Sequence, residues 1–282
     1  MTTTQFSFDD INGKITVITG GAGVLCGAFT RALTGVGAKI ALLDINKNAA
    51  QKAAKDVAKL SGAQVIGIAC DVLSKKSLEA ARIQINAKFG PIDILVNGAG
   101  GNAKSATTEI EQISDMVDAP KSFYGLEIDG FNSVFNLNFI GTLLRPKFYH
   151  KICRTKKFGV VINISSMAAF HPLSKIPAYS AAKAAVSNIT EWLAVHLAPI
   201  GIRINAMAPG FFLTEQLKFL AFDEAGNLTP RYERVISKTA MKRLGDPEEL
   251  QGTLLYLASD ISSFVTGVVI PVDGGFNADS GI

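Results

Sequence analysis

The fold is decided by the stretch Ile15-Thr16-Val17-Ile18-Thr19-Gly20-Gly21-Ala22-Gly23-Val24-Leu25-Cys26-Gly27. Its first five residues are all β-branched, which predicts a strand, and a helical pattern over Val24–Val36 follows the glycines. Glycines allow a sharp turn and a close approach of backbone to phosphate, and the helix N-terminus adds N–H donors. A glycine-rich turn can also be only a tight turn, but its place between a strand and a helix favours a dinucleotide site.

The same alternation of strand and helix continues along the chain. Further strands are predicted at Lys39–Leu43, Gln64–Ala69, Ile92–Val96, Gly159–Ile164, Ile202–Met207 and Gly267–Val272. Helices are predicted at Lys47–Leu60, Lys75–Phe89, Gly130–Lys156, Ala178–Ala198 and Pro247–Ser259. The strands are almost continuously apolar, as strands covered on both faces are. We therefore predict an α/β fold: a Rossmann-type, doubly wound parallel sheet of about seven strands with helices on both faces.

Residues 1–282 are expected to form a single domain for dinucleotide binding and catalysis, because the composition shows no break. Two connections, near 101–129 and 211–246, are much longer than the usual handful of residues. Each follows the carboxyl end of a predicted strand, the edge at which doubly wound folds bind ligands. We expect both to be substrate loops.

Composition excludes several classes of function. The net charge is only +4 and the basic residues are scattered, which argues against nucleic-acid binding. No apolar run reaches the ~18 residues of a membrane span and no leader pattern is seen, so a cytoplasmic protein is expected. The cysteines Cys26, Cys70 and Cys153 are odd in number and widely spaced, which predicts core residues and neither disulfides nor zinc. The three histidines are equally dispersed, and no metal is expected.

The second predicted strand leads to Asp44, twenty-four residues after Gly20. An acidic side chain at this place accepts hydrogen bonds from ribose hydroxyls and repels a 2′-phosphate, which predicts NAD as the cofactor in preference to NADP. The alternative is that Asp44 caps the following helix.

Three later motifs make the pattern specific: Asn97-Gly98-Ala99-Gly100, Ile164-Ser165-Ser166 and Tyr179-Ser180-Ala181-Ala182-Lys183. Together with Thr19-Gly20 and Pro209-Gly210, and in this order, they resemble the short-chain dehydrogenase/reductase superfamily from about Asn12 to Gly275. The glycines depart from the usual pattern, since Gly23 and Gly27 each sit one residue away from the expected places.

The resemblance implies a role for each matching residue. Tyr179 is the acid/base, Lys183 its activator, Ser166 the hydroxyl that holds the substrate oxygen, and Asn138 a member of the proton relay. The implied cofactor-binding residues are Gly20, Gly21, Gly23, Val24, Leu25, Asp44, Asp71, Val72, Asn97, Gly98, Ala99, Tyr179, Lys183, Pro209, Gly210, Phe212 and Thr214.

The chemistry of this set can also be argued from the residues. An alcohol must lose its proton as hydride departs, so a base has to lie at the oxygen. Tyrosine is a poor base at neutral pH, and Lys183, four residues along one helical face, is expected to lower the pKa of Tyr179. A neutral donor such as Ser166 would stabilise the charge that develops on the substrate oxygen.

The extended Asn97–Asn138 interval, the glycine turn and the carboxyl terminus further resemble the D-mannonate oxidoreductase (fructuronate reductase) branch of the superfamily, whose members act on sugar acids. Lys104 and Arg231, on the two long loops, are candidates to pair with a substrate carboxylate, and His171, five residues after Ser166, is a candidate to contact substrate. The alternative for each is a solvated surface side chain. The alternatives are a reductase of ketogluconate or of a 3-oxoacyl thioester, and a silent dinucleotide-binding regulator. Apolar residues on more than one face of Ala178–Ala198 predict a homotetramer or homodimer.

Overall fold

A computed structural model describes residues 7–145, 159–214 and 221–279. Its centre is one parallel sheet in the order β3-β2-β1-β4-β5-β6-β7. The strands are β1 (Ile15–Thr19), β2 (Lys39–Asp44), β3 (Val65–Ala69), β4 (Ile94–Asn97), β5 (Gly159–Ile164), β6 (Ile202–Pro209) and β7 (Val269–Val272). The predicted doubly wound sheet of seven strands is confirmed, with strand ends shifted by two residues or fewer.

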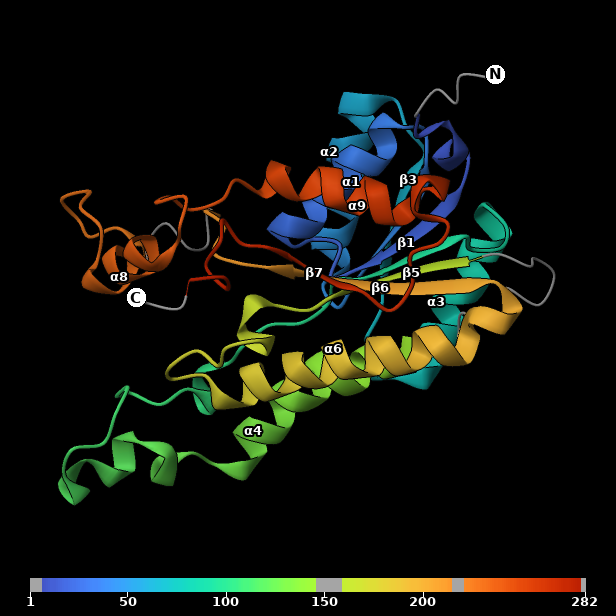
Figure 1. Cartoon of the computed structure of the whole chain (residues 1–282). Helices are drawn as coiled ribbons and strands as arrows, with labels where there is room; N and C mark the ends of the chain where they lie inside the picture. Colours follow the sequence, from blue (N-terminus) through green and yellow to red (C-terminus); the bar gives the residue numbers. More distant parts are fainter. Residues whose placement is uncertain (1–6, 146–158, 215–220, 280–282) are drawn as a thin grey trace.

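Helices cover both faces of the sheet (Figure 1). One face carries α1 (Val24–Gly35), α2 (Lys47–Ser61) and α9 (Gln251–Ala258), and the other carries α3 (Lys75–Lys88), α4 (Ile128–Phe135) and α6 (Pro177–Leu197). Successive side chains of a strand point to opposite faces. Ile18 accordingly packs into the core with Phe29 and Leu254, whereas its neighbour Val17 packs into the second core with Leu193.

Two predicted helices differ from those observed. The helix predicted over Gly130–Lys156 is α4 followed by a π-helical turn at Asn136–Ile140, and helical backbone then continues to residue 145. The rest of that prediction lies outside the described residues. The helix predicted from Pro247 begins as a 3₁₀ turn, Pro247–Leu250, and its start is closed by a capping box formed by Asp246 and Glu249.

The predicted loop 211–246 contains a helix that was not predicted, α8 (Pro230–Lys238). Its signals were a proline at the first helical position and two apolar residues three apart, Tyr232 and Val235, which are both buried. In Figure 1, α8 and the 101–129 segment extend beyond the sheet on the same side. Arg234 on α8 donates to Glu111 at 2.7 Å, so the two segments are in contact.

Within the described residues, no helix is long and apolar enough to cross a membrane. Cys26 and Cys70 are buried free thiols, in keeping with the prediction of core residues, and Cys153 lies outside the described residues.

Candidate active site

The glycine turn after β1 lies directly against the turn after β4. Gly20 has a φ of +66°, and a Cβ placed there would lie 2.8 Å from the Ala99 Cα. A Cβ on Gly98 would lie 2.4 Å from the Cys26 Sγ, so a larger residue at either position would collide with its neighbours. Thr19 Oγ1 accepts a hydrogen bond from the Ala99 N–H at 3.2 Å and ties the two turns together.

The helix α1 begins at the predicted place, with Gly23 as its N-cap. No side chain caps this end, so the N–H groups of the first turn, beginning at Val24 and Leu25, are available to an anion. The departure of the glycines from the usual spacing therefore leaves the helix start intact.

Asp44 lies at the end of β2 beside this turn. Its Oδ2 accepts from the Ala22 N–H at 3.2 Å and its Oδ1 from the Asn46 N–H at 3.0 Å. The residue that caps α2 is Asn46, whose Oδ1 accepts from the Ala49 N–H, so the alternative role of Asp44 as the helix cap is wrong.

Ser166, Tyr179 and Lys183 come together at the carboxyl end of β5. Ser166 is the cap of a short 3₁₀ turn, and its side chain is hydrogen-bonded with that of Tyr179. Lys183, one turn further along α6, is buried; its Nζ donates to the Ile164 carbonyl at 2.7 Å and lies 5.5 Å from the centroid of the Tyr179 ring. The predicted catalytic residues are thus neighbours in space.

The pKa values of Tyr179 and Lys183 differ from the expectation that Lys183 lowers the pKa of Tyr179. Burial raises the pKa of Tyr179, and the hydrogen bond with Ser166 opposes this; Lys183 is not among the causes of the shift. Burial, and then the positive charge of Arg145, lower the pKa of Lys183 to about 7. Lys183 is therefore only partly protonated near neutrality, which limits how strongly it can lower the pKa of the tyrosine.

Asn138 is buried in the π-helical turn and holds the start of the 101–129 segment. Its Nδ2 donates to the Gly101 carbonyl at 2.7 Å and its Oδ1 accepts from the Gly101 N–H at 3.1 Å. A Cβ on Gly100 would lie 2.5 Å from the Asn138 Oδ1 and 3.3 Å from the Lys183 Nζ. Asn138 and Lys183 therefore flank the same glycine, as a shared site requires.

The remaining predicted cofactor residues lie along the same edge of the sheet. Asp71 and Val72 follow β3, Asn97 ends β4, and Pro209 ends β6 with Gly210 next to it. Thr214 is buried a few residues later. Phe212 differs from the others because its ring belongs to the core and fills the space above Gly245, so its side chain packs inside the protein.

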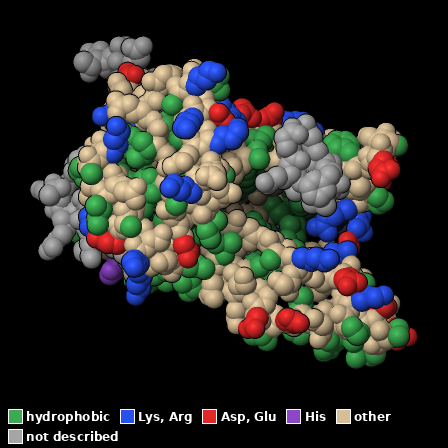
Figure 2. Space-filling view, turned by 180° about the vertical axis from the view of Figure 1, so that it is seen from behind, with side chains coloured by type: hydrophobic (Ala, Val, Ile, Leu, Met, Phe, Trp, Pro, Cys, Tyr) green, Lys and Arg blue, Asp and Glu red, His purple; other side chains and the backbone are tan. Residues whose placement is uncertain are grey.

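Of the three substrate candidates, Arg231 alone lines a hollow of about 240 Å³, whose wall includes Leu173 and Ser174 just before α6. The hollow is also lined by Arg234, Lys238, Leu173 and Phe211, and Leu173 N–H donates to Ser180 Oγ, next to Tyr179. Figure 2 shows Lys and Arg side chains gathered around the depression between the α8 and 101–129 segments.

Lys104 and His171 are exposed side chains outside the lining of this hollow. Arg234 and Lys238 are not among the residues predicted from the sequence, although their spacing with Arg231 places all three cations within two turns of one helix.

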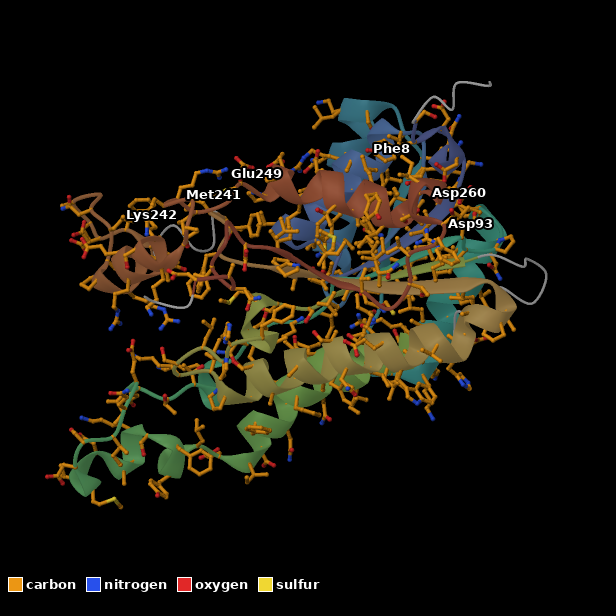
Figure 3. The ribbon with its side chains drawn as sticks, viewed as in Figure 1. Phe8, Asp93, Met241, Lys242, Glu249 and Asp260 are labelled. Atoms are coloured by element: carbon orange, nitrogen blue, oxygen red, sulfur yellow. The ribbon has the colours of Figure 1, made fainter. Side chains whose placement is uncertain are left out.

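A larger hollow, of about 860 Å³, lies at the opposite edge of the sheet. Its walls include Asp93 and Asp260, which Figure 3 places at the end of the molecule away from Met241 and Lys242. It contains none of the predicted site residues, and parallel sheets bind ligands at the carboxyl ends of their strands. We therefore place the active site at the carboxyl edge.

Comparison with known proteins identifies the family of the chain. A family model described as enoyl-(acyl carrier protein) reductase matches residues 24–277. An uncharacterized oxidoreductase of Bacillus subtilis, UxuB, is 44% identical over 97% of this chain and 98% of its own length. The chain belongs to the short-chain dehydrogenase/reductase family of oxidoreductases.

Two further matches are informative. A crystal structure from Haemophilus influenzae, provisionally named a D-mannonate oxidoreductase and containing bound NAD, is 46% identical with a TM-score of 0.92, covering 97% of this chain and 98% of that one. The 5-keto-D-gluconate 5-reductase of Escherichia coli K12 is 32% identical over 93% of this chain and 95% of its own length.

Proposed function

We propose that the protein is an NAD-dependent dehydrogenase that interconverts a secondary alcohol and a ketone on a sugar acid, with D-mannonate and D-fructuronate as the substrate pair. The observation that carries the reaction type is the contact of Tyr179 with Ser166 beside buried Lys183. The similarity to an NAD-bound structure named for D-mannonate supports the cofactor and the substrate.

The residues at the carboxyl edge fit a dinucleotide. A Cβ at Gly20, Gly21 or Gly98 would collide with its neighbours. The first turn of α1 has no side-chain cap, and Asp44 ends β2 beside the glycine turn. NAD, when bound, supplies the acceptor and donor of hydride. The protein residues handle the proton: Tyr179 Oη takes it from the substrate hydroxyl during oxidation, and Ser166 Oγ holds the same oxygen.

Lys183 and Asn138 complete the proton path in this proposal. Lys183 is partly protonated near neutrality, since burial lowers its pKa to about 7, so it can exchange a proton under working conditions. Asn138 positions Gly100 and Gly101 next to the Lys183 Nζ through its two hydrogen bonds to Gly101.

The first prediction concerns Asp44. NAD should be preferred to NADP by at least about tenfold in kcat/KM, because the Asp44 carboxylate repels a 2′-phosphate. Asp44→Ala should reduce that preference, and Asp56→Ala, on the exposed surface of α2, should leave it unchanged. Steady-state rates with both cofactors test this, and equal use of NAD and NADP by the unmodified protein would contradict the role of Asp44.

The cationic hollow supports an acidic substrate. Arg231 and Lys238 line it with Arg234, whose guanidinium already binds the Glu111 carboxylate. A charge-assisted contact to a substrate carboxylate in a closed site is worth about 2–4 kcal/mol, which is on the order of a hundredfold in affinity.

The second prediction compares acid and alcohol substrates. kcat/KM for D-mannonate should exceed that for D-mannitol by about a hundredfold, and Arg231→Gln should remove most of that difference. Lys104→Gln is the matched control, since Lys104 lies outside the hollow. NADH absorbance with a panel of sugar acids and polyols measures the kcat/KM ratio in the unmodified protein and in each variant. A preference for 5-keto-D-gluconate would favour the alternative substrate, and a preference for a hydrophobic ketone would overturn the sugar-acid assignment.

We further propose a homotetramer or homodimer in the cytoplasm. On α6, Trp192 and Val195 are 57% and 79% exposed, and such large apolar side chains on one helix favour contact with a second copy. The third prediction is that light scattering at micromolar concentration gives a mass of two or four chains. Trp192→Glu should reduce that mass, and a monomeric unmodified protein would contradict the proposal.

A further inference from the structure

Arg145 is a buried cation that the catalytic scheme does not use. It follows the π-helical turn of Asn138, and only 2% of its surface is exposed. Its Nη1 donates to the Asn97 Oδ1 at 3.3 Å and its Nη2 to the Ala99 carbonyl at 3.2 Å. Among the described residues its Nε finds no hydrogen-bond partner. Arg145 therefore contacts the Asn97–Ala99 turn, which packs against Gly20.

No carboxylate neutralises this guanidinium in the described part of the chain. Its hydrogen bonds go to an amide oxygen and a carbonyl, and the ionisable groups that affect its pKa are Cys70 and Cys26. The adjoining residues 146–158, which the structure does not describe, contain neither Asp nor Glu. Burial lowers the pKa of Arg145 to about 9, so it still carries its charge at neutral pH.

A second buried cation shares this region. The positive charge of Arg145 helps to lower the pKa of Lys183. The Lys183 Nζ donates to the Ile164 carbonyl. A buried arginine charge beside a partly protonated lysine, with no acid hydrogen-bonded to either among the described residues, destabilises a folded protein unless a ligand brings the opposite charge. The ligand expected at this edge carries a doubly charged pyrophosphate.

We propose that Arg145 is a positioning residue for the dinucleotide. It holds the Asn97–Ala99 turn through its two hydrogen bonds, and the pyrophosphate of the cofactor supplies the negative charge that balances its guanidinium. This inference rests on the cofactor part of the proposed function and not on the identity of the substrate. Arg145 acts through the low-dielectric interior and through the turn, without touching the reacting atoms.

The test measures ligand binding in the full-length protein without turnover. Arg145→Met removes the charge and keeps an apolar chain, and Arg145→Lys keeps the charge but loses the second hydrogen bond. Fluorescence titration should give an NADH Kd about 10- to 100-fold weaker for Arg145→Met. The Kd of ADP-ribose should rise by the same factor in Arg145→Met, because ADP-ribose carries the same pyrophosphate. The Kd of adenosine should not change. In Arg145→Lys, the Kd of each of the three ligands should stay within about threefold of its value in the unmodified protein.

Thermal stability separates this role from a structural one. Without ligand, Arg145→Met should melt at the same temperature as the unmodified protein or higher, because an uncompensated buried charge has been removed. Arg203 is the matched control, since its guanidinium donates to the carbonyls of Val265, Leu257 and Ser259 at the other end of β6. Arg203→Met should melt at a lower temperature and bind NADH normally.

Several outcomes would overturn the proposal. An NADH Kd within twofold in Arg145→Met, or an equal loss of adenosine binding, would show that the charge is not directed at the pyrophosphate. If Arg145→Met fails to fold, Arg145→Gln takes its place with the same expectations, and failure of both neutral variants to fold would assign Arg145 a structural role. The unmodified protein is titrated with NADH first: absence of binding there refutes the proposed cofactor itself, whereas lack of activity on sugar acids leaves this test unaffected.

Discussion

Tyr179→Phe should lower kcat by about 10³- to 10⁴-fold while NADH binding stays within about threefold, because the substitution removes only the group that transfers the proton. The phenol interacts with Ser166, the residue that we propose holds the substrate oxygen. Rates are measured by NADH absorbance at saturating substrate, and binding by fluorescence titration.

The matched control for this substitution is Tyr256→Phe. Tyr256 packs against the core on α9, on the opposite face of the sheet, and its loss of a hydroxyl should leave kcat within about twofold. Near-normal turnover of Tyr179→Phe would refute the mechanism, because the mechanism assigns the proton transfer to the Tyr179 Oη.

Lys183→Met should lower kcat by at least about a hundredfold and weaken NADH binding, and it should also change how stability depends on pH. Burial lowers the pKa of Lys183 from 10.5 to about 7. Between these values the unfolded chain binds more protons than the folded protein, so this residue lowers stability fully below pH 7 and progressively less as the pH rises toward 10.5.

The variant should therefore melt a few degrees above the unmodified protein at pH 6 to 7, and the gap should narrow toward pH 9 to 10. The lost hydrogen bond to the Ile164 carbonyl offsets part of the gain. Lys52→Met is the control, because Lys52 is an exposed residue paired with Asp56 and should show no such trend. A melting-temperature difference that does not vary with pH would show that Lys183 is not a desolvated cation.

The elements that the sequence predicts well are those with a local signal. The strands appear as continuous apolar runs because both faces of the sheet are covered, and β1 is buried at every position. Ser166, Tyr179 and Lys183 were predicted because strand β5 and helix α6 hold them at fixed spacings, which the motif reflects. These are short-range regularities.

The elements that it misses depend on distant contacts. Arg145 on a helix would ordinarily face water, and in its buried position it is hydrogen-bonded to Asn97 and Ala99, which lie 48 and 46 positions away in the chain. Arg234 meets Glu111 across 123 positions of the chain, a pairing that no local pattern specifies. Asn138, in the π-helical turn, likewise bonds to Gly101, which lies 37 positions away in the chain.

The central claim, transfer of hydride between NAD and a carbon of a sugar acid, is tested most directly with NADH carrying deuterium at both C4 positions. After incubation with D-fructuronate, mass spectrometry and NMR of the product should find D-mannonate with one deuterium on the carbon that bears the new hydroxyl group. Tyr179→Phe should give almost none in the same time. Consumption of labelled NADH without deuterium in the product, or no reaction with D-fructuronate while another ketone is reduced rapidly, would contradict the account.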